Sequence, residues 1–205
     1  NGLSISIPPG GVVNATSNAA YSGTVNISAR WINPAGSDLP STMPGDLRGL
    51  NGAGNLQLLT TYGMAAVELT GTGGELLQLA PGKKSTLSLP IPASISASAP
   101  ATIPLWYFDE SKGLWKEEGS ATRSGNNYVG EVSHFSFWNC DLPANYVQFN
   151  CTVLNSANQP IPHVWVKITV VNNPINNRSG NTDSSGYVSG PIPANAQLLL
   201  EIFGS

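Results

Sequence analysis

The first predicted domain ends in Val132-Ser133-His134-Phe135-Ser136-Phe137-Trp138-Asn139-Cys140-Asp141, so this segment decides how the chain divides into domains. It also holds one of the two histidines. Side chains of an extended strand point alternately to its two faces. That period places Val132, His134, Ser136 and Trp138 on one face, and Ser133, Phe135 and Phe137 on the other. We therefore predict a closing strand in which the imidazole of His134 lies beside the hydroxyl of Ser136.

This pair of side chains is the basis for predicting a chemical reaction in this chain. An imidazole next to a hydroxyl is the minimal combination of nucleophile and base. The carbonyl nearest to the Ser136 hydroxyl belongs to Phe135, so the pair would cut its own chain between Phe135 and Ser136. Such a cut also needs a strained peptide bond and an oxyanion site, and the sequence shows neither. In the structural alternative, His134 hydrogen-bonds Ser136 or a carbonyl and orders the closing strand.

Short alternating segments separated by turns extend outward from this segment on both sides. Charged residues make up 10% of the 205 residues, against 22 Gly and 16 Pro, and no segment holds a helical period for more than a turn or two. Turns recur about every ten residues, which is typical of β-sandwiches. The predicted fold class is all-β, with two antiparallel β-sandwich domains in tandem and these strands: 3–7, 25–30, 56–59, 65–69, 76–79, 85–90, 104–108, 114–118, 128–131, 147–153 and 163–171.

The domain boundary is predicted at Asp141-Leu142-Pro143-Ala144-Asn145, which is short, polar and contains proline. Residues 1–141 would form the first sandwich and residues 146–205 the second. The abrupt start at Asn1 and the end in an apparent strand suggest a piece of a longer protein.

The charge balance excludes several classes of partner. The formal net charge is -3, and the largest basic cluster is Lys83-Lys84. We therefore expect no binding to nucleic acid. No apolar run approaches the roughly 20 residues of a membrane-spanning helix, so no membrane insertion is expected. Two histidines and two cysteines so spaced predict no metal site, and no cofactor motif is present.

Cys140 and Cys151 lie on either side of the predicted boundary. A disulfide between them would join the two domains and would indicate an oxidising compartment. The alternative is a pair of buried thiols, and the sequence leaves both possibilities open.

The second domain resembles the carboxypeptidase regulatory-like, or transthyretin-like, β-sandwich family. The resemblance rests on Asn158-Gln159-Pro160-Ile161-Pro162, on Val164 and Val166, and on Thr182-Asp183 with Gly186-Tyr187. It implies a small extracellular spacer or adhesion module without catalysis, whose last strands are cut off here.

The first domain resembles the β-sandwich of ankyrins and netrin receptors, and more closely the related domain of cartilage intermediate layer proteins and bacterial surface proteins. The matching residues are Met43-Pro44-Gly45-Asp46, Tyr62-Gly63-Met64, 104–110, 115–119 and the His134-Phe135-Ser136 segment. Some relatives of this fold cut themselves between Phe and Ser of that tripeptide. The resemblance therefore implies His134 as base, Ser136 as nucleophile and Phe135 as acyl donor, although other relatives keep similar residues and do not cut.

The leading functional prediction is a non-enzymatic structural or adhesion module, extracellular or at a cell surface, exported and of bacterial origin. Its partner would be a protein or a glycan of unknown identity. The first alternative is autoproteolysis between Phe135 and Ser136. The second alternative is glycan binding through Trp106 or Trp115, which requires that their rings be exposed.

Overall fold

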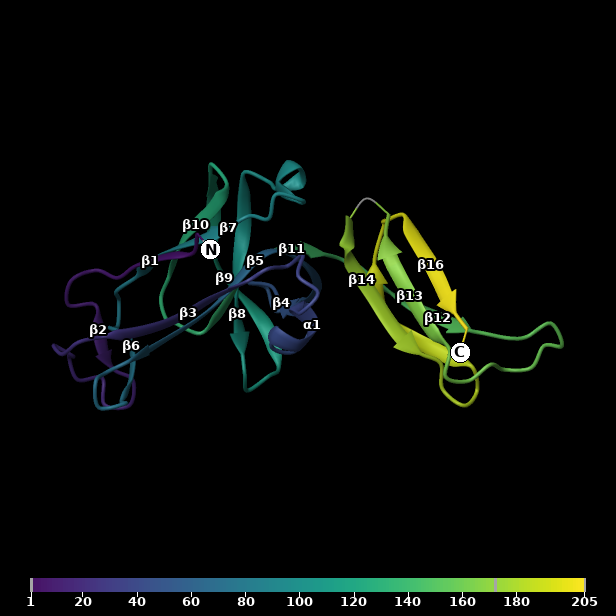
Figure 1. Cartoon of the computed structure of the whole chain (residues 1–205), viewed down its shortest axis with the longest axis horizontal. Helices are drawn as coiled ribbons and strands as arrows, with labels where there is room; N and C mark the ends of the chain where they lie inside the picture. Colours follow the sequence, from purple (N-terminus) through teal and green to yellow (C-terminus); the bar gives the residue numbers. More distant parts are fainter. Residues whose placement is uncertain (1, 172, 205) are drawn as a thin grey trace. The chain divides into compact units, whose positions relative to one another are not determined.

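The computed structural model describes residues 2–171 and 173–204 and divides into two compact units, Asn1–Leu142 and Pro143–Ser205 (Figure 1). Nearly all regular structure is β and almost every strand pair is antiparallel, which confirms the all-β prediction. The helical segments are α1 (Leu39–Thr42) and a 3-10 turn at Ser96–Ser98. Within the described residues, no helix has the length and apolar character that crossing a membrane requires.

The strands of unit 1 belong to one hydrogen-bonded network instead of two separate sheets. The main order is β1-β7-β10-β9-β8-β11-β5-β6-β2, with β3 and β4 also paired to β5. A short parallel contact joins β4 to β9. The bounds are β1 Ser4–Ser6, β2 Val12–Asn14, β3 Asn26–Ile32, β4 Arg48–Leu50, β5 Leu56–Thr70, β6 Leu76–Leu79, β7 Ser85–Pro90, β8 Thr102–Asp109, β9 Leu114–Ser124, β10 Asn127–Val132 and β11 Phe137–Ala144.

Strand β5 makes the network continuous because it changes partners along its length. It pairs with β4 near its start, with β3 over Met64–Thr70, and with β6 at its end. The sequence predicted two strands, 56–59 and 65–69, with a turn at Tyr62-Gly63 between them, and this is wrong because β5 is one continuous strand over Leu56–Thr70. Glycine fits there for steric reasons: a Cβ on Gly63 would lie 3.0 Å from the carbonyl oxygen of Pro90.

Three wholly buried tryptophans dominate the core of unit 1 (Trp106, Trp115 and Trp138). A buried indole N–H needs an acceptor. Each indole N–H donates to a backbone carbonyl. Trp106 donates to the carbonyl of Asp141 at 3.1 Å, Trp115 to that of Asp46 at 2.9 Å, and Trp138 to that of His134 at 2.9 Å. These three tryptophans therefore hold loops and strands against the core.

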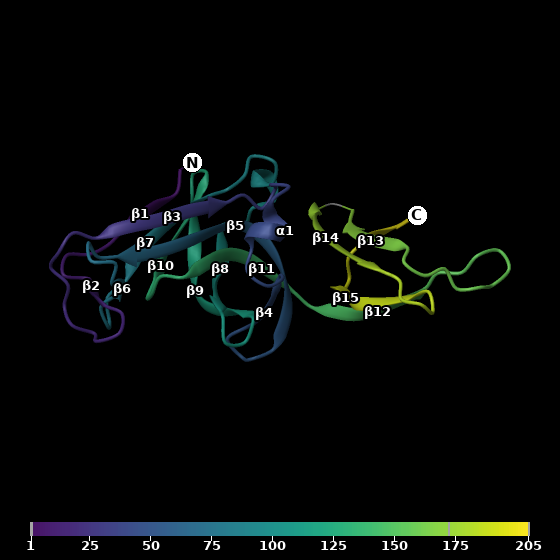
Figure 2. The same cartoon turned by 60° about the horizontal axis from the view of Figure 1, so that its bottom comes forward.

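Unit 2 contains two small sheets, which Figure 2 shows apart, with β12 and β15 in one and β13 and β14 in the other. One pairs β12 (Tyr146–Thr152) with β15 (Tyr187–Pro193). The other has the order β14-β13-β16, with β14 Asn173–Asn181, β13 Trp165–Val170 and β16 Leu198–Phe203. Buried side chains between them include Val153, Val164, Val166 and Ile168. Strand β14 lies outside the strands predicted from the sequence.

The boundary between the units lies between Leu142 and Pro143, inside the predicted segment 141–145, but most of this segment is strand instead of an irregular linker. Strand β11 runs to Ala144 and β12 begins at Tyr146, so little irregular chain separates them. Asp141, which the prediction placed at the start of the linker, is wholly buried in unit 1. The polar side chain of Asp141 was interpreted as a sign of an exposed linker, but its carboxyl is hydrogen-bonded to Asn139 inside the core.

Candidate functional site

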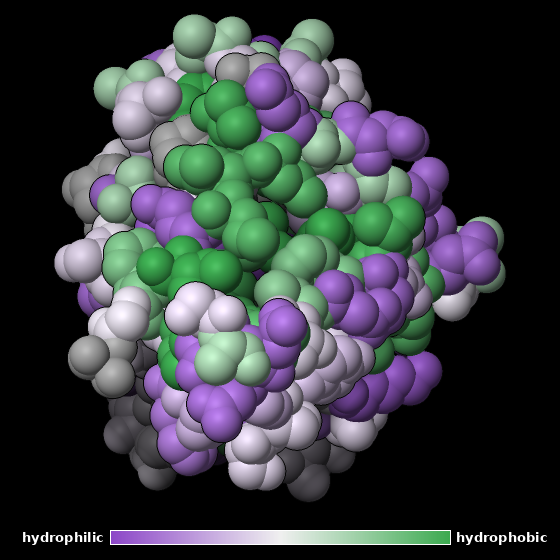
Figure 3. Space-filling view, turned by 90° about the vertical axis from the view of Figure 1, so that its right-hand side faces the viewer, coloured by the Kyte–Doolittle hydropathy of each residue, from purple (hydrophilic) through white to green (hydrophobic). Residues whose placement is uncertain are grey.

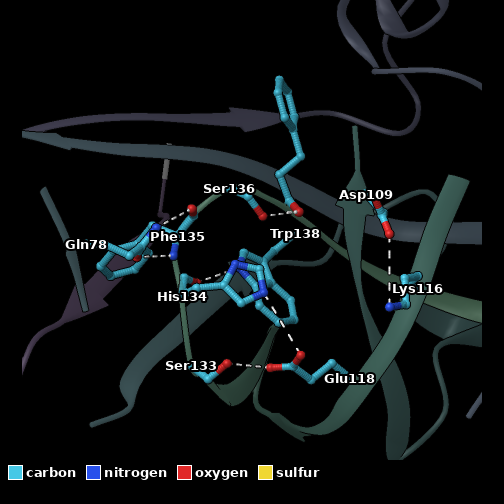
Figure 4. Close-up of polar contacts among 10 residues, drawn as sticks. Gln78, Asp109, Lys116, Glu118, Ser133, His134, Phe135, Ser136 and Trp138 are labelled. Atoms are coloured by element: carbon cyan, nitrogen blue, oxygen red, sulfur yellow. Dashed lines mark hydrogen bonds and ion pairs between the residues drawn. The ribbon is translucent and has the colours of Figure 1, made fainter. Parts of the chain in front are cut away.

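The His134-Phe135-Ser136 segment is a bend that connects β10 to β11, so the predicted closing strand is wrong at these residues. The side chain of Gln78, on β6, takes the place of a neighbouring strand (Figure 4). Its Oε1 accepts a hydrogen bond from the Phe135 N–H at 2.6 Å, and its Nε2 donates to the Phe135 carbonyl at 2.9 Å. The N–H of Val67 donates to the Ser136 carbonyl at 3.1 Å. The backbone is thus satisfied without a ladder.

The imidazole of His134 lies among aromatic rings. Its centroid is 4.7 Å from that of Tyr107, edge to face, and 5.0 Å from that of Trp138. Its Nε2 is 4.0 Å from Oε2 of Glu118, whose other oxygen accepts a hydrogen bond from the Ser133 hydroxyl at 2.5 Å. Burial lowers the pKa of His134, although Glu118 partly opposes this effect. His134 is therefore neutral near pH 7.

His134 and Ser136 do not form the predicted pair. The Ser136 hydroxyl donates to the Phe137 carbonyl at 3.2 Å, while the imidazole points toward Glu118 on the other side of the bend (Figure 4). Once the segment bends, the strand period that put the two side chains on one face no longer applies. The same-face prediction is wrong for this physical reason. Cleavage of the Phe135–Ser136 bond stays a prediction.

The structure adds one group that the sequence reasoning missed. An amide N–H that donates to a carbonyl oxygen stabilises negative charge as that charge develops there. Gln78 Nε2 stands in this relation to the carbonyl of Phe135. No sequence signal marked Gln78, because it lies 57 positions from Phe135 and outside every motif.

An open groove of about 770 Å³ lies beside this bend. Its lining includes Phe135, Ser136 and Phe137 together with residues of β3, β5 and β6. Arg30, Glu68 and Glu110 contribute charged groups to it. The groove therefore gives solvent and solutes access to the Phe135–Ser136 peptide bond.

The predicted glycan platform is not formed. Trp106 and Trp115 are both wholly buried, so neither ring can stack on a sugar. They are buried because each fills the core beneath the curved sheet, where Phe108 packs edge to face on Trp115 at 5.3 Å. An exposed aromatic pair occurs instead in unit 2, where Trp165 and Phe203 lie 4.7 Å apart.

Both cysteines are free thiols in the structure. Cys140 is wholly buried in β11, and burial raises its thiol pKa well above the usual value. Cys151 is half-buried in β12 of the other unit. Because the two cysteines lie in different units, the disulfide between them stays a prediction. Among the described residues, no cluster of three or more metal-binding side chains occurs.

The chain is similar to cartilage intermediate layer protein 2. It is 30% identical to the Homo sapiens protein over 122 residues and 35% identical to the Mus musculus protein over 120 residues. Each match covers 58% of this chain and 10% of the relative, so the chain spans about a tenth of the relatives' length. No family model and no solved structure matches the chain.

These similarities support a relationship to cartilage intermediate layer proteins and are compatible with a non-enzymatic extracellular module. They do not test the resemblance to ankyrins or to the carboxypeptidase regulatory-like family, which stay predictions. Both relatives are mammalian, and neither supports a bacterial origin.

Proposed function

We propose that this chain is a non-enzymatic binding module of an extracellular or cell-surface protein, and that unit 2 binds a protein partner along strand β16. The observation that carries this proposal is the exposure of large apolar side chains on β16. Leu199 and Ile202 are each 50% exposed, and Leu200 and Phe203 are exposed as well. Figure 3 shows apolar residues gathered on one face of the molecule.

Strand β16 is also a free edge. It ends the order β14-β13-β16 and pairs with β13 alone within the described residues. An edge strand offers unpaired N–H and C=O groups, and an extended segment of another protein can pair with them. Exposed apolar side chains on the same strand supply contact area to such a segment.

The experiment measures binding of the immobilised chain to a panel of purified extracellular-matrix proteins and to a glycan array. A variant with Leu200→Lys and Ile202→Lys places charge on the edge strand. Leu76→Lys is the matched control, because Leu76 is 57% exposed on β6 of unit 1. We expect the double variant to bind the protein partner at least about tenfold more weakly, and the control to bind as wild type.

Two outcomes contradict this proposal. One is undiminished binding by the double variant when circular dichroism shows it to be folded. The other is binding to glycans alone with loss on Trp165→Ala, which would make the exposed Trp165–Phe203 pair the site instead.

Self-cleavage is the second candidate function, and one observation favours it: Gln78 Nε2 already donates to the carbonyl that would be attacked. Against it stands the direction of the Ser136 hydroxyl, which donates to Phe137 and not to a base. The intact mass of the purified protein distinguishes the two functions.

A further inference from the structure

Thr61, Asn139 and Asp141 form a polar cluster inside the core of unit 1. Thr61 lies on β5 and the other two on β11, its neighbour in the sheet order. The Thr61 hydroxyl donates to Asn139 Oδ1 at 2.6 Å, and Asn139 Nδ2 donates to Asp141 Oδ2 at 2.7 Å. All three side chains are at most 2% exposed. A hydroxyl, a carboxamide and a carboxyl therefore meet in a dry site.

The carboxyl of this cluster is only partly satisfied. Asp141 Oδ1 is buried without a hydrogen-bond partner, whereas most buried polar atoms have one. Burial raises the pKa of Asp141 well above its usual value, and the Thr61 hydroxyl acts in the opposite direction. This shift favours the protonated form of Asp141, in which one oxygen can give a proton and the other can accept one.

We propose that this cluster forms an ester cross-link between the side chains of Thr61 and Asn139, with Asp141 as the proton relay. Thr61 Oγ1 attacks Cγ of Asn139, so an Oγ1–Cγ bond forms and the Cγ–Nδ2 bond breaks. The hydroxyl proton passes along its hydrogen bond to Asn139 Oδ1. The protonated carboxyl of Asp141, which contacts Nδ2, gives its proton to that nitrogen and recovers one from Asn139 Oδ1 as the Cγ–Nδ2 bond breaks. The nitrogen leaves as ammonia, Asp141 ends protonated as it began, and no oxidant or other reactant is needed.

Three features of the site favour this step. The hydroxyl is held against the carboxamide by neighbouring strands, and such positioning replaces a bimolecular encounter. The relay through one neutral carboxyl creates no net charge in a buried site, where an isolated ion would be costly. Burial also excludes water, so the ester, once formed, is protected from hydrolysis.

The link would tie β5 to β11 across 78 positions of sequence. A covalent bond that closes such a long loop restricts the unfolded chain strongly. The ester would therefore stabilise unit 1 of an extracellular module covalently, without a disulfide bond.

The experiment measures the intact mass of the folded protein after prolonged incubation at neutral pH. We expect a species lighter than the sequence mass by one ammonia. Trypsin cuts after Lys and Arg, so the digest should contain peptide 49–83 joined to peptide 124–167. The sequence mass for wild type overturns the proposal. Loss of ammonia with peptides 49–83 and 124–167 not joined also overturns the proposal, because that result indicates a cyclic imide at an asparagine, for example at Asn51-Gly52, and no cross-link.

The variants separate the roles of the three residues. Thr61→Val removes the nucleophile at nearly constant volume, and Asp141→Asn removes the relay, so both should keep the full mass. Thr61→Ser retains a hydroxyl and should restore the joined peptides, which answers the objection that Thr61→Val simply misfolds. Ammonia loss from Thr61→Val with joined peptides would show another nucleophile and refute the assignment.

Discussion

The carboxamide of Gln78 pairs with both backbone polar groups of Phe135, accepting from its N–H at 2.6 Å and donating to its carbonyl at 2.9 Å. Two hydrogen bonds from one side chain hold the bend between β10 and β11 in place and leave the Phe135 ring buried. A side chain thus does here what a neighbouring strand does elsewhere in the sheet.

Gln78→Ala should lower the free energy of unfolding by about 1–3 kcal/mol, because it leaves two backbone groups of a partly buried bend without partners. Urea denaturation measures the effect. Gln57→Ala is the matched control, since the Gln57 amide donates to the carbonyl of the adjacent Leu56 and should cost less than about 0.5 kcal/mol. Equal midpoints for the two variants would contradict the bridging role of Gln78.

Wild-type protein should stay uncut at Phe135–Ser136 during incubation near neutral pH, because the Ser136 hydroxyl and the His134 imidazole point to different partners. Denaturing electrophoresis and intact mass check this expectation. Two fragments that meet at this bond, with loss of cutting in Ser136→Ala, would contradict it. In that event Gln78→Ala should slow the cut by about 10²–10³-fold, the usual effect of removing one oxyanion donor.

The period-two pattern predicted most strands because it depends on local alternation, which burial against one core face enforces. The hairpin of β8 and β9 and the run of β13 are examples. The pattern failed at His134–Ser136, where a distant glutamine decides the backbone, and at Gly63, where glycine allows close approach instead of a turn. Neither contact leaves a local trace in the sequence.

The candidate site shows the same limit. His134 and Ser136 are two positions apart in the sequence, but the directions of their side chains depend on Glu118 and on the bend, which the sequence pattern does not show. The buried cluster of Thr61 and Asp141 could not be predicted, since its members come from two strands and one of them looked like linker.

Gly49→Ala should destabilise unit 1 by about 1–3 kcal/mol through overpacking. A Cβ at this position would lie 2.8 Å from the ring of Trp106 and 2.9 Å from Leu59, both wholly buried. Gly52→Ala is the control, because a Cβ there meets no atom within 4 Å. Thermal unfolding followed by tryptophan fluorescence reports both. A Gly49 variant as stable as the Gly52 variant would show that the core beneath β4 can relax.

The stability of unit 1 should fall as pH rises above about 4, and the cause should be Asp141. Its pKa is raised in the folded state, so between the unfolded value of about 3.9 and the folded value the native state binds more protons. The stabilisation is therefore complete at pH below the unfolded pKa and is lost as pH rises through the folded pKa. His134 acts in the opposite direction below about pH 6.5, because burial lowers its pKa and stability is lost as pH falls.

Asp141→Asn isolates the carboxyl from the histidine, since the amide oxygen of the variant can still accept from Asn139 Nδ2 and cannot titrate. Urea midpoints of wild type and variant are measured between about pH 4 and pH 8, and the difference between them is plotted against pH, which removes the shared contribution of His134. We expect the wild type to lose stability relative to the variant as pH rises. A difference that stays constant across this range would mean that the folded and unfolded pKa values of Asp141 coincide, and that the carboxyl is not protonated in the core.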